Sequence, residues 1–426
     1  MPFWSESPIS TRNAYSFSIL YFVIGFAVVL STVAVLPAQG QTRLSLHDAI
    51  WQAQNSPSAR IAQAQVMAAQ GGVKQAGLRP NPRLYLQSED LRPWSNNFNF
   101  SNNTEDYAYV SQTIETGGKR SARLQFADAN LRATEAQEAV QLHQLAGRVA
   151  ASYWTALSTA RISQLLAEDL AAVDEMVRYH QQRVDAGAMR GADLLRMQIE
   201  RNRLFIALQA AQRDAALSRV ELGRQIGHPL EGNVELSDSI DTIDSVPHEE
   251  LAEVLARRPD VVVAREAVAA AEADLKLQKS LRVPDFDVLG GYKRNSGANT
   301  LYTGLQIQLP FRNRNQGEVE RAAANVQVAQ AQLEQMTLTA AAEVNAAMEA
   351  YTREQQIVEK TLPEMRDRAR KDLAIMSDAY RTGGVDLLRY IDAERTEIEV
   401  ESNALRTLSD FHQSALRLEL AYGVHP

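Results

Sequence analysis

Two matching tripeptides, each headed by an aspartate, are the clearest candidates for chemistry in this sequence. Asp193-Leu194-Leu195 and Asp386-Leu387-Leu388 follow glycine-containing turns and lie 193 positions apart. An aspartate at the start of a helix accepts hydrogen bonds from free backbone amides and complements the positive end of the helix dipole. A carboxylate that is gathered with its copies around an axis attracts cations instead. Both interpretations stay open, and they do not exclude each other.

Other kinds of chemistry find little support. The chain has no cysteine, so disulfides, thiolate metal sites, cysteine nucleophiles and an N-terminal lipidated cysteine are excluded. Its seven histidines show no spacing that places two on one helix face, so we expect no zinc site. Glu399 and Glu401 are two positions apart and point in different directions on a helix, which favours a solvated surface over acid–base catalysis. We therefore expect no enzyme activity, no metal site and no cofactor.

Composition indicates a folded chain that is not built for nucleic acid. Hydrophobic residues make up 45% and charged residues 23% of the 426 positions, a balance that supports a packed core. The formal net charge is −8, from 44 basic and 52 acidic side chains. This charge gives no reason to expect nucleic acid as a partner.

Residues 1–40 have the pattern of a secretory signal peptide. Ile19 to Leu36 is an almost unbroken apolar run, preceded by Arg12 and followed by the small-x-small pattern Ala38-Gln39-Gly40. The pattern predicts export with cleavage; the alternative is a retained membrane anchor, because the run approaches a spanning length. No second apolar run of that length occurs, so we do not expect the rest of the chain to cross a membrane as helices.

Long helices must position the two tripeptides. From about Gly118 to Ile226 the chain is rich in Ala, Leu, Gln, Glu and Arg, and it is interrupted once, over 186–195. Before the interruption lie about seventy residues without proline, which make a helix of roughly 100 Å at 1.5 Å rise per residue. Apolar residues recur along it at three- and four-residue steps, so one stripe is made to pack against another helix. The glycines let the chain reverse, and a second helix runs back.

A shorter helix and a β-hairpin precede this long hairpin. Leu44 to Leu78 is expected to be a helix, with Ser45 as its N-cap and Pro57 as a kink or break. After Pro82 the apolar period changes to two, and Tyr107 to Ile114 gives a second strand beyond a polar loop. The pattern therefore predicts an antiparallel strand pair with a long loop.

The same order of elements occurs twice. Pro57 matches Pro259 at an offset of 202, and the same offset superposes helix positions and strand phase. The chain therefore consists of two internal repeats, each with a helix, a β-hairpin and a long helical hairpin. The repeats span 41–227 and 249–426, and an irregular linker over 228–248 joins them.

The second repeat closely parallels the first. Its strands are expected over 285–293 and 301–309, around a loop at 295–299, and helix then continues to Thr382 with Pro363 as its only interior proline. Four short strands per chain cannot close on themselves, and four long helices with modest apolar stripes make no thick core. Association solves both problems, because several copies can share one barrel of strands and one tube of helices.

Four short segments point to a known family. They are SQTIETGGKR at 111–120, LPFRNRNQG at 309–317, GLRPNP at 77–82 and YIDAERT at 390–396. Together with the order of elements, they resemble the TolC-type outer-membrane efflux channels over nearly the whole mature length. The two strand-to-helix junctions are similar to those of the CzcC-like heavy-metal efflux branch.

The resemblance implies a mainly α protein with β-strands. It implies a homotrimer whose twelve strands form a β-barrel in the outer membrane of a Gram-negative-type bacterium, in contact with its lipid, and whose helices continue as a long α-helical barrel in the periplasm. Such a channel is the passive exit duct of a tripartite pump. Its substrates, heavy-metal cations in this branch, would come from an RND-type inner-membrane pump through a periplasmic adaptor, the membrane fusion protein. Two alternatives stay open: a duct for drugs or other small molecules, and a soluble periplasmic coiled-coil adaptor.

In this family the two helix-hairpin tips face the adaptor and narrow the entrance. The resemblance assigns these roles to Gly187, Ala188, Met189, Arg190, Gly191, Asp193, Leu194 and Leu195, and to Gly383, Gly384, Val385, Asp386, Leu387 and Leu388. In a trimer every acidic residue that faces the axis becomes a ring of three, which favours cations. The candidates for such an acidic ring are Asp185, Asp193 and Asp386.

The first strand loop carries three aromatic residues, Trp94, Phe98 and Phe100. Tryptophan and other aromatic side chains gather at the two lipid boundaries of membrane barrels. An aromatic girdle is therefore one interpretation of these residues, and packing within the loop is the other.

Overall fold

A computed structural model describes residues 43–232 and 234–424, and the predicted signal peptide at 1–40 lies outside these residues. The first repeat and the start of the linker contain β1 (Arg43–Leu44), α1 (Leu46–Ala53), α2 (Pro57–Ala76), β2 (Arg83–Glu89), α3 (Phe100–Asn103), β3 (Glu105–Ile114), α4 (Lys119–Asp185), α5 (Gly191–Ile226) and β4 (Glu235–Leu236). The second repeat contains α6 (Leu251–Arg257), α7 (Pro259–Ser280), β5 (Phe286–Asn295), β6 (Ala298–Ile307), α8 (Gln316–Gln356), the π-helical turn η1 (Ile357–Thr361), α9 (Leu362–Thr382) and α10 (Leu387–Ala421).

The first helical stretch is two helices. Ser45 caps α1, because its hydroxyl oxygen accepts a hydrogen bond from the Asp48 amide at 3.1 Å. The chain then breaks over 54–56, and Pro57 occupies the first helical position of α2, where no backbone N–H is needed. Ser56 caps this second helix by accepting from the Ala59 amide at 3.3 Å. The predicted N-cap is confirmed, and the expected single helix over 44–78 is divided at Pro57.

The two β-hairpins join into one antiparallel sheet in the order β2-β3-β5-β6. β3 and β5 pair over ten positions, from Glu105 opposite Asn295 to Ile114 opposite Phe286. The expected loop at 295–299 shortens to Ser296 and Gly297, whose φ angles of 46° and 88° are both left-handed, as a tight hairpin turn requires. Strands β2 and β6 are the two edges of the sheet.

The linker between the repeats is not wholly irregular. Its strand β4 pairs in parallel with β1, with Arg43 opposite Glu235 and Leu44 opposite Leu236. The Tyr153 hydroxyl on α4 donates to the Leu44 carbonyl at 2.9 Å, so the small sheet is attached to the helices. A two-residue strand with its partner 192 positions away leaves no periodic signal in the sequence, which is why the linker was expected to be irregular.

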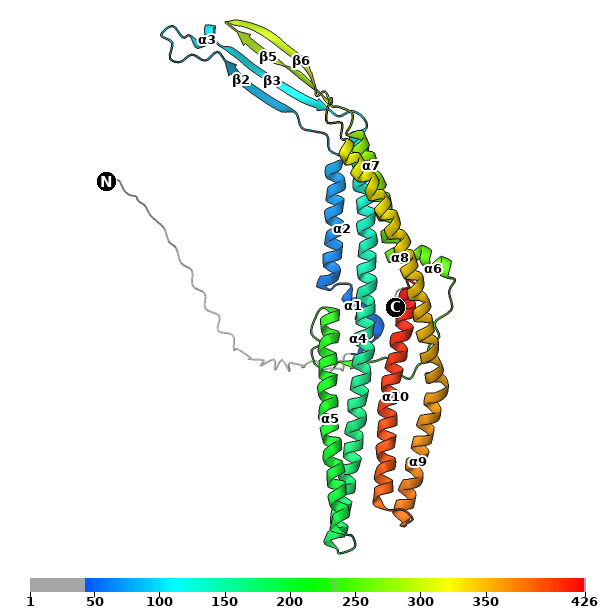
Figure 1. The fold of residues 1–426 in the computed structure, drawn as a ribbon. Coiled ribbons are helices and arrows are strands. Elements are labelled where there is room, and N and C mark those ends of the chain that lie inside the picture. The colour runs from blue at the N-terminus through cyan, green and yellow to red at the C-terminus, as the bar shows by residue number, and fades with distance from the viewer. Residues whose placement is uncertain (1–42, 233, 425–426) are drawn as a thin grey trace, which may run out of the picture. The chain divides into compact units, whose positions relative to one another are not determined.

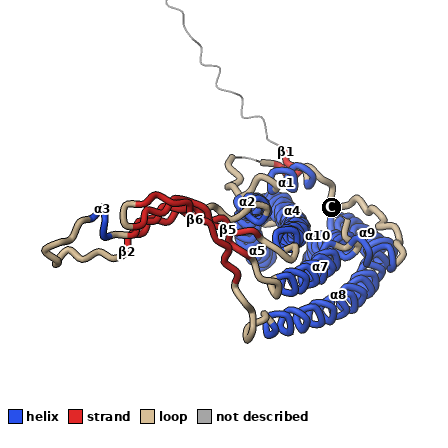
Figure 2. Tube along the Cα trace, turned by 90° about the horizontal axis from the view of Figure 1, so that it is seen from above, coloured by secondary structure: helices blue, strands red, loops and turns tan. Residues whose placement is uncertain are grey.

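The long helices lie side by side in the order α5, α4, α10, α9 (Figure 1). Seen from above, they run roughly parallel, and the four-stranded sheet extends away from them (Figure 2). One apolar cluster, around Tyr153, Leu222 and Phe411, joins both repeats. A second cluster, nearer the hairpin turns, contains Val173 of α4 and Met197 of α5. Among the described residues, no helix combines the length and the apolar character that crossing a membrane requires.

The long helix that leads from β6 to the second hairpin turn contains a π turn. Helix α8 passes into η1 at Ile357, and α9 begins at Leu362 with Pro363 in its first turn. Proline has no N–H for the α-helical bond to the fourth preceding carbonyl, and its ring would clash with that group. The wider turn accommodates the proline, so the expected continuous helix is present with one local change of winding.

Candidate functional site

The first hairpin turn lies at the end of α4 that is remote from the sheet (Figure 1). α4 ends at Asp185, the chain reverses at Gly187 with a left-handed φ of 70°, and α5 begins at Gly191. The exposed Asp185 carboxylate accepts a hydrogen bond from the Gln181 side chain at 2.9 Å. Asp193 lies inside the first turn of α5 and is not the N-cap, so the capping interpretation is wrong for this residue.

The second turn has different chemistry at its aspartate. Gly383 reverses the chain with a φ of 78°, and Asp386 is the N-cap of α10. Its carboxylate accepts from the Arg389 amide at 3.1 Å, so the capping interpretation is confirmed here. Asp386 is also exposed, which leaves its second oxygen available to solvent.

The two tripeptides present their leucines in the same way. Leu194 and Leu387 are buried, whereas Leu195 and Leu388 are 61% and 48% exposed. The other predicted tip residues form the turn surface: Gly187, Ala188, Arg190, Gly191, Gly383 and Gly384 are exposed, and Met189 and Val385 are half-buried. Each turn therefore anchors one leucine inside its hairpin and leaves the next leucine exposed.

A buried histidine joins the two hairpins just above the turns. His180 of α4 is 1% exposed, and its Nδ1 lies 2.7 Å from the Met176 carbonyl oxygen. A carbonyl only accepts, so Nδ1 carries a proton and donates to it. The second ring nitrogen, Nε2, forms a hydrogen bond with the Tyr380 hydroxyl of α9 at 2.6 Å. The sequence gives no sign of this contact, because His180 and Tyr380 lie 200 positions apart.

An ionic cluster lies farther from the turns, between α9 and α10. Glu401 was expected on a solvated surface, but it is 6% exposed and bound by two arginines of α9. The Arg366 and Arg370 guanidinium groups approach its two oxygens at 2.8 and 2.6 Å. Arg366 also reaches Asp241 of the linker at 3.0 Å. The expectation failed because α10 turns Glu401 toward α9 and Glu399 toward solvent.

Further carboxyl groups of α10 are crowded against Asp169 of α4 and Glu200 of α5. Burial, and then the charges of Asp169 and Glu200, raise the pKa of Glu394 to about 7. Burial, and then the charge of Glu397, raise the pKa of Asp169 on α4 to about 6. Glu200 of α5 differs from these two because it is paired with Arg395.

The sequence contained a signal for this crowding. Glu394, Glu397 and Glu401 lie at steps of three and four, so they share one face of α10. Glu401 belongs to this stripe, whereas Glu399 lies outside it and is exposed. Among the described residues, no group of three or more His, Asp or Glu side chains is arranged to hold a metal ion.

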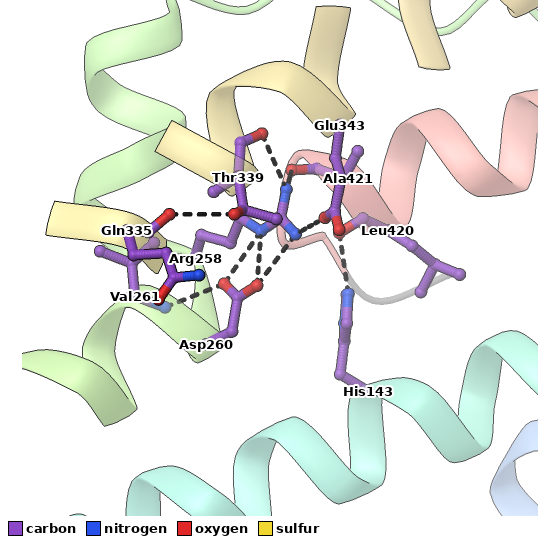
Figure 3. A network of polar contacts seen from close by, with 10 residues as sticks. His143, Arg258, Asp260, Val261, Gln335, Thr339, Glu343, Leu420 and Ala421 are labelled. Atoms are coloured by element: carbon purple, nitrogen blue, oxygen red, sulfur yellow. Dashed lines mark hydrogen bonds and ion pairs between the residues drawn. The ribbon is translucent and has the colours of Figure 1, made fainter. Parts of the chain in front are cut away.

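A buried arginine ties the start of the second repeat to its end (Figure 3). The Arg258 guanidinium binds the Asp260 carboxylate at 2.9 Å and also contacts Glu343 of α8. It donates to the Ala340 carbonyl at 3.1 Å and to the Ala421 carbonyl at the end of α10. These bonds fix the beginning of α7 against two other helices of the second repeat.

The sheet has two chemically different faces. Side chains alternate between the faces along each strand, so the register assigns every residue to one of them. One face is apolar and exposed, and its members are Leu84, Leu86, Val110, Ile114, Val288, Tyr292, Leu301, Leu305 and Ile307. The other face is polar and includes Arg83, Gln87, Glu105, Asp287, Lys293 and four tyrosines. An exposed apolar face of this size needs a non-aqueous partner.

The loop between β2 and β3 carries the three predicted aromatic residues. Trp94 is 80% exposed, Phe100 is largely exposed and Phe98 is half-buried. The loop ends in α3, whose N-cap Asn99 accepts from the Ser101 amide at 2.9 Å. Packing within the loop and a girdle at a lipid boundary both stay predictions for these residues.

Comparisons with known proteins agree with this architecture. The family model "Outer membrane efflux protein" matches residues 52–228 and 251–424. The chain is 25% identical to the cobalt-zinc-cadmium resistance protein CzcC of Cupriavidus metallidurans, over 92% of this chain and 93% of that protein. It is 27% identical to the nickel and cobalt resistance protein CnrC of the same species, over 66% and 67% of the two chains.

A solved structure shows the same fold. The open state of the MtrE outer membrane channel of Neisseria gonorrhoeae superposes with a TM-score of 0.75 at 19% identity, covering 89% of each chain. The resemblance that the junction segments indicated is thereby confirmed. Because the family model covers both repeats, the chain belongs to the outer membrane efflux protein family.

Proposed function

We propose that this chain is the outer-membrane channel of a tripartite efflux pump. Three copies would combine their strands into one twelve-stranded barrel and their helices into one periplasmic tube. The channel would be a passive exit duct, fed by an RND-type inner-membrane pump through a periplasmic adaptor. No catalytic step is part of this proposal.

The observation that carries the proposal is the two-faced sheet. Its apolar face suits lipid and its polar face suits an aqueous path, which is the alternation found in membrane barrels. The outer edges of β2 and β6 pair with no further strand among the described residues. An open strand edge of this kind favours pairing with another chain. Copies of the same sheet satisfy both requirements together.

The helices support association as well. Helix α5 lies at one end of the helical row and α9 at the other (Figure 1). Exposed apolar residues follow α5 at helical spacing: Leu195, Ile199, Ile206, Leu217 and Val220. On α9, Met365 and Ile375 are exposed in the same way. A ring in which α5 of one copy packs beside α9 of the next would cover both surfaces.

Heavy-metal cations are the substrates that we propose. The resistance proteins CzcC and CnrC are named for cobalt, zinc, cadmium and nickel. The exposed Asp185 and Asp386 of the two turns, and the half-buried Asp193, would provide rings of carboxylates at the entrance. Growth-inhibition assays test this part: deletion of the gene should increase sensitivity to divalent metals more than to hydrophobic drugs. The reverse pattern would favour the duct for drugs or other small molecules.

The two turns are the proposed contacts for the adaptor. Each presents an exposed leucine, Leu195 or Leu388, beside glycines that leave the backbone accessible. We expect Asp386→Arg to impair efflux while the amount of trimer stays unchanged, because the substitution reverses a charge at the aperture. Leu388→Ala is the matched test of the apolar contact. Unchanged efflux in both variants would remove the turns from the mechanism.

The first experiment is the molar mass of the mature protein extracted in detergent from the outer-membrane fraction. Light scattering should give the mass of three chains after subtraction of the detergent. A variant with lysine at the edge positions Leu84 and Leu305 should not assemble, because both leucines lie on the apolar face. A soluble periplasmic monomer of the wild type would contradict the proposal and support the coiled-coil adaptor.

A further inference from the structure

We propose that the polar face of the sheet contains a binding site for hydrophobic organic cations such as quaternary ammonium ions. The site is a row of tyrosines, and its ligand class goes beyond the metal ions proposed above. The inference rests on the proposed function in one respect, because it takes the polar face to line the duct.

The tyrosines occupy one register row that crosses all four strands. Tyr85 of β2 pairs with Tyr109 of β3, Tyr109 pairs with Gly291 of β5, and Gly291 pairs with Tyr302 of β6. The Tyr85 and Tyr109 rings stack with centroids 4.9 Å apart and an interplanar angle of 12°. The ring centroids of Tyr109 and Tyr302 are 5.0 Å apart, although strand β5 lies between their two strands. The rings therefore form one continuous aromatic surface.

Gly291 makes this surface possible. A Cβ atom at this position would lie 2.5 Å from the Tyr109 Cβ and 2.3 Å from the Ala108 carbonyl oxygen. No side chain fits there, and the two neighbouring rings meet above the glycine instead. A strand interior normally loses stability with glycine, so its presence in the middle of this row indicates close packing over the backbone.

The aromatic surface already holds a cation from its own chain. In the adjoining row, Tyr107 pairs with Lys293, and the Lys293 ammonium lies 4.8 Å from the centre of the Tyr107 ring. The Glu105 carboxylate holds this ammonium at 2.9 Å. Tyr107 in turn makes an edge contact with Tyr302 at 5.7 Å, so the occupied ring is continuous with the row.

The chemistry of the surface selects the ligand class. Aromatic faces attract cations through the ring quadrupole, most strongly cations that shed water easily. Hydrated divalent metal ions prefer carboxylate and other oxygen ligands, which the tyrosine row does not concentrate. The polar face carries three acidic residues, Glu89, Glu105 and Asp287, and two basic residues, Arg83 and Lys293. This small excess of negative charge favours a cationic ligand. Quaternary ammonium and phosphonium ions combine both requirements.

The test is block of channel current in planar lipid bilayers. Tetrabutylammonium should reduce the conductance of the wild-type channel, and an equal concentration of Mg²⁺ should not. Replacing Tyr85, Tyr109 and Tyr302 together by leucine should weaken the block about tenfold, whereas replacement by phenylalanine should preserve it, because the ring faces remain. Tyr292→Leu is the matched control, since Tyr292 lies on the apolar face of the same sheet.

Two outcomes would overturn the inference. Block that persists in the leucine variant would mean that tetrabutylammonium binds elsewhere, and block that Tyr292→Leu abolishes would point to a general effect on the sheet. Calorimetric titration of the detergent-extracted protein with tetrabutylammonium measures the same binding without a current. If the wild type carries no current, the proposed function fails. The titration still tests the tyrosine row by itself, because the wild-type protein should bind tetrabutylammonium more tightly than the leucine variant.

Discussion

The two repeats share the order of their elements, but they secure the same positions by different means. Pro57 and Pro259 both occupy the first position of a helix. In the first repeat the preceding Ser56 caps that helix locally. In the second repeat the equivalent residue is Arg258, which makes no cap and binds two carboxylates and two distant carbonyl groups. Proline fixes the backbone in both repeats, while the stabilising contacts are local in one and long-range in the other.

The two repeats also differ in their β-hairpins and in the helices α5 and α10, which run back from the turns. The first hairpin closes through a long loop with exposed aromatic residues, and the second closes through a two-residue turn. Each returning helix carries a Glu-Arg dipeptide, Glu200-Arg201 in α5 and Glu394-Arg395 in α10. Glu200 is paired with Arg395 across the helices, whereas burial leaves Glu394 among other carboxyl groups. The glutamate of the first dipeptide is therefore held by an ion pair, and the pKa of the glutamate of the second is raised by burial.

The largest expected effect comes from breaking the long-range contact at Arg258. Arg258→Met leaves Asp260 and Glu343 without their cation, and removal of one partner from a buried ionic group costs about 3 kcal/mol. Ser56→Ala should cost only about 1 kcal/mol, because it removes one capping bond. Urea unfolding of the detergent-extracted protein, followed by circular dichroism, measures both losses. Equal losses would show that the repeats are stabilised alike.

A pH series sharpens the comparison between Glu394 and Glu200. Burial raises the pKa of Glu394 to about 7 from an ordinary 4.5, so the native state holds a proton that the unfolded state releases within this window. The free energy of unfolding should therefore fall as pH rises from about 4.5 to 7, by on the order of 3 kcal/mol, and stay level above it. Asp169 adds to the same slope, because its pKa is also raised.

The matched variants separate these two carboxyl groups. Glu394→Gln keeps an uncharged side chain at every pH, so most of the slope should disappear. Glu200→Gln removes the partner of Arg395 and should lower stability at every pH, while a smaller slope persists because burial is the largest cause of the raised pKa of Glu394. Thermal unfolding measured at pH 5, 6, 7 and 8 provides the test. A slope that survives in Glu394→Gln would assign the titration to another group.

The smallest expected effect concerns the two turns. Asp386→Ala removes a capping bond and should open the first turn of α10 by about 1 kcal/mol. Asp193→Ala removes only a favourable charge near a helix start, worth about 0.5 kcal/mol. Hydrogen exchange of the amides in each first turn reports such local opening. Faster exchange at Asp193→Ala than at Asp386→Ala would reverse the order.

The features that sequence analysis located are those with local causes. Apolar periods of three and four predicted the long hairpins, and a period of two predicted the strands. The glycine turns were located because positive φ angles favour glycine, as at Gly187 and Gly383. The Asp386 cap followed from its place directly before a helix, and the same logic failed at Asp193 because α5 begins two residues earlier.

The features that sequence analysis missed depend on partners far along the chain. The pairing of β3 with β5 unites two hairpins about 180 residues apart. The burial of Glu401 depends on Arg366 and Arg370, and the role of Arg258 depends on Ala421 at the other end of the repeat. The tyrosine row needs the register of three strand pairs and one glycine. No short window of sequence contains both sides of any of these contacts.

The π turn at Ile357–Thr361 lets one rod carry two sequence registers. A π turn closes its hydrogen bonds one residue later than an α turn, so it takes up about one extra residue with little added rotation or rise. The buried positions of α9 are therefore out of step by one residue with those of α8, although the rod continues with the same side facing its neighbours. Deleting one residue within this turn would leave Arg366 and Tyr380 facing their present partners, and the cost would fall on Pro363, whose ring would meet a carbonyl group in the narrower α turn.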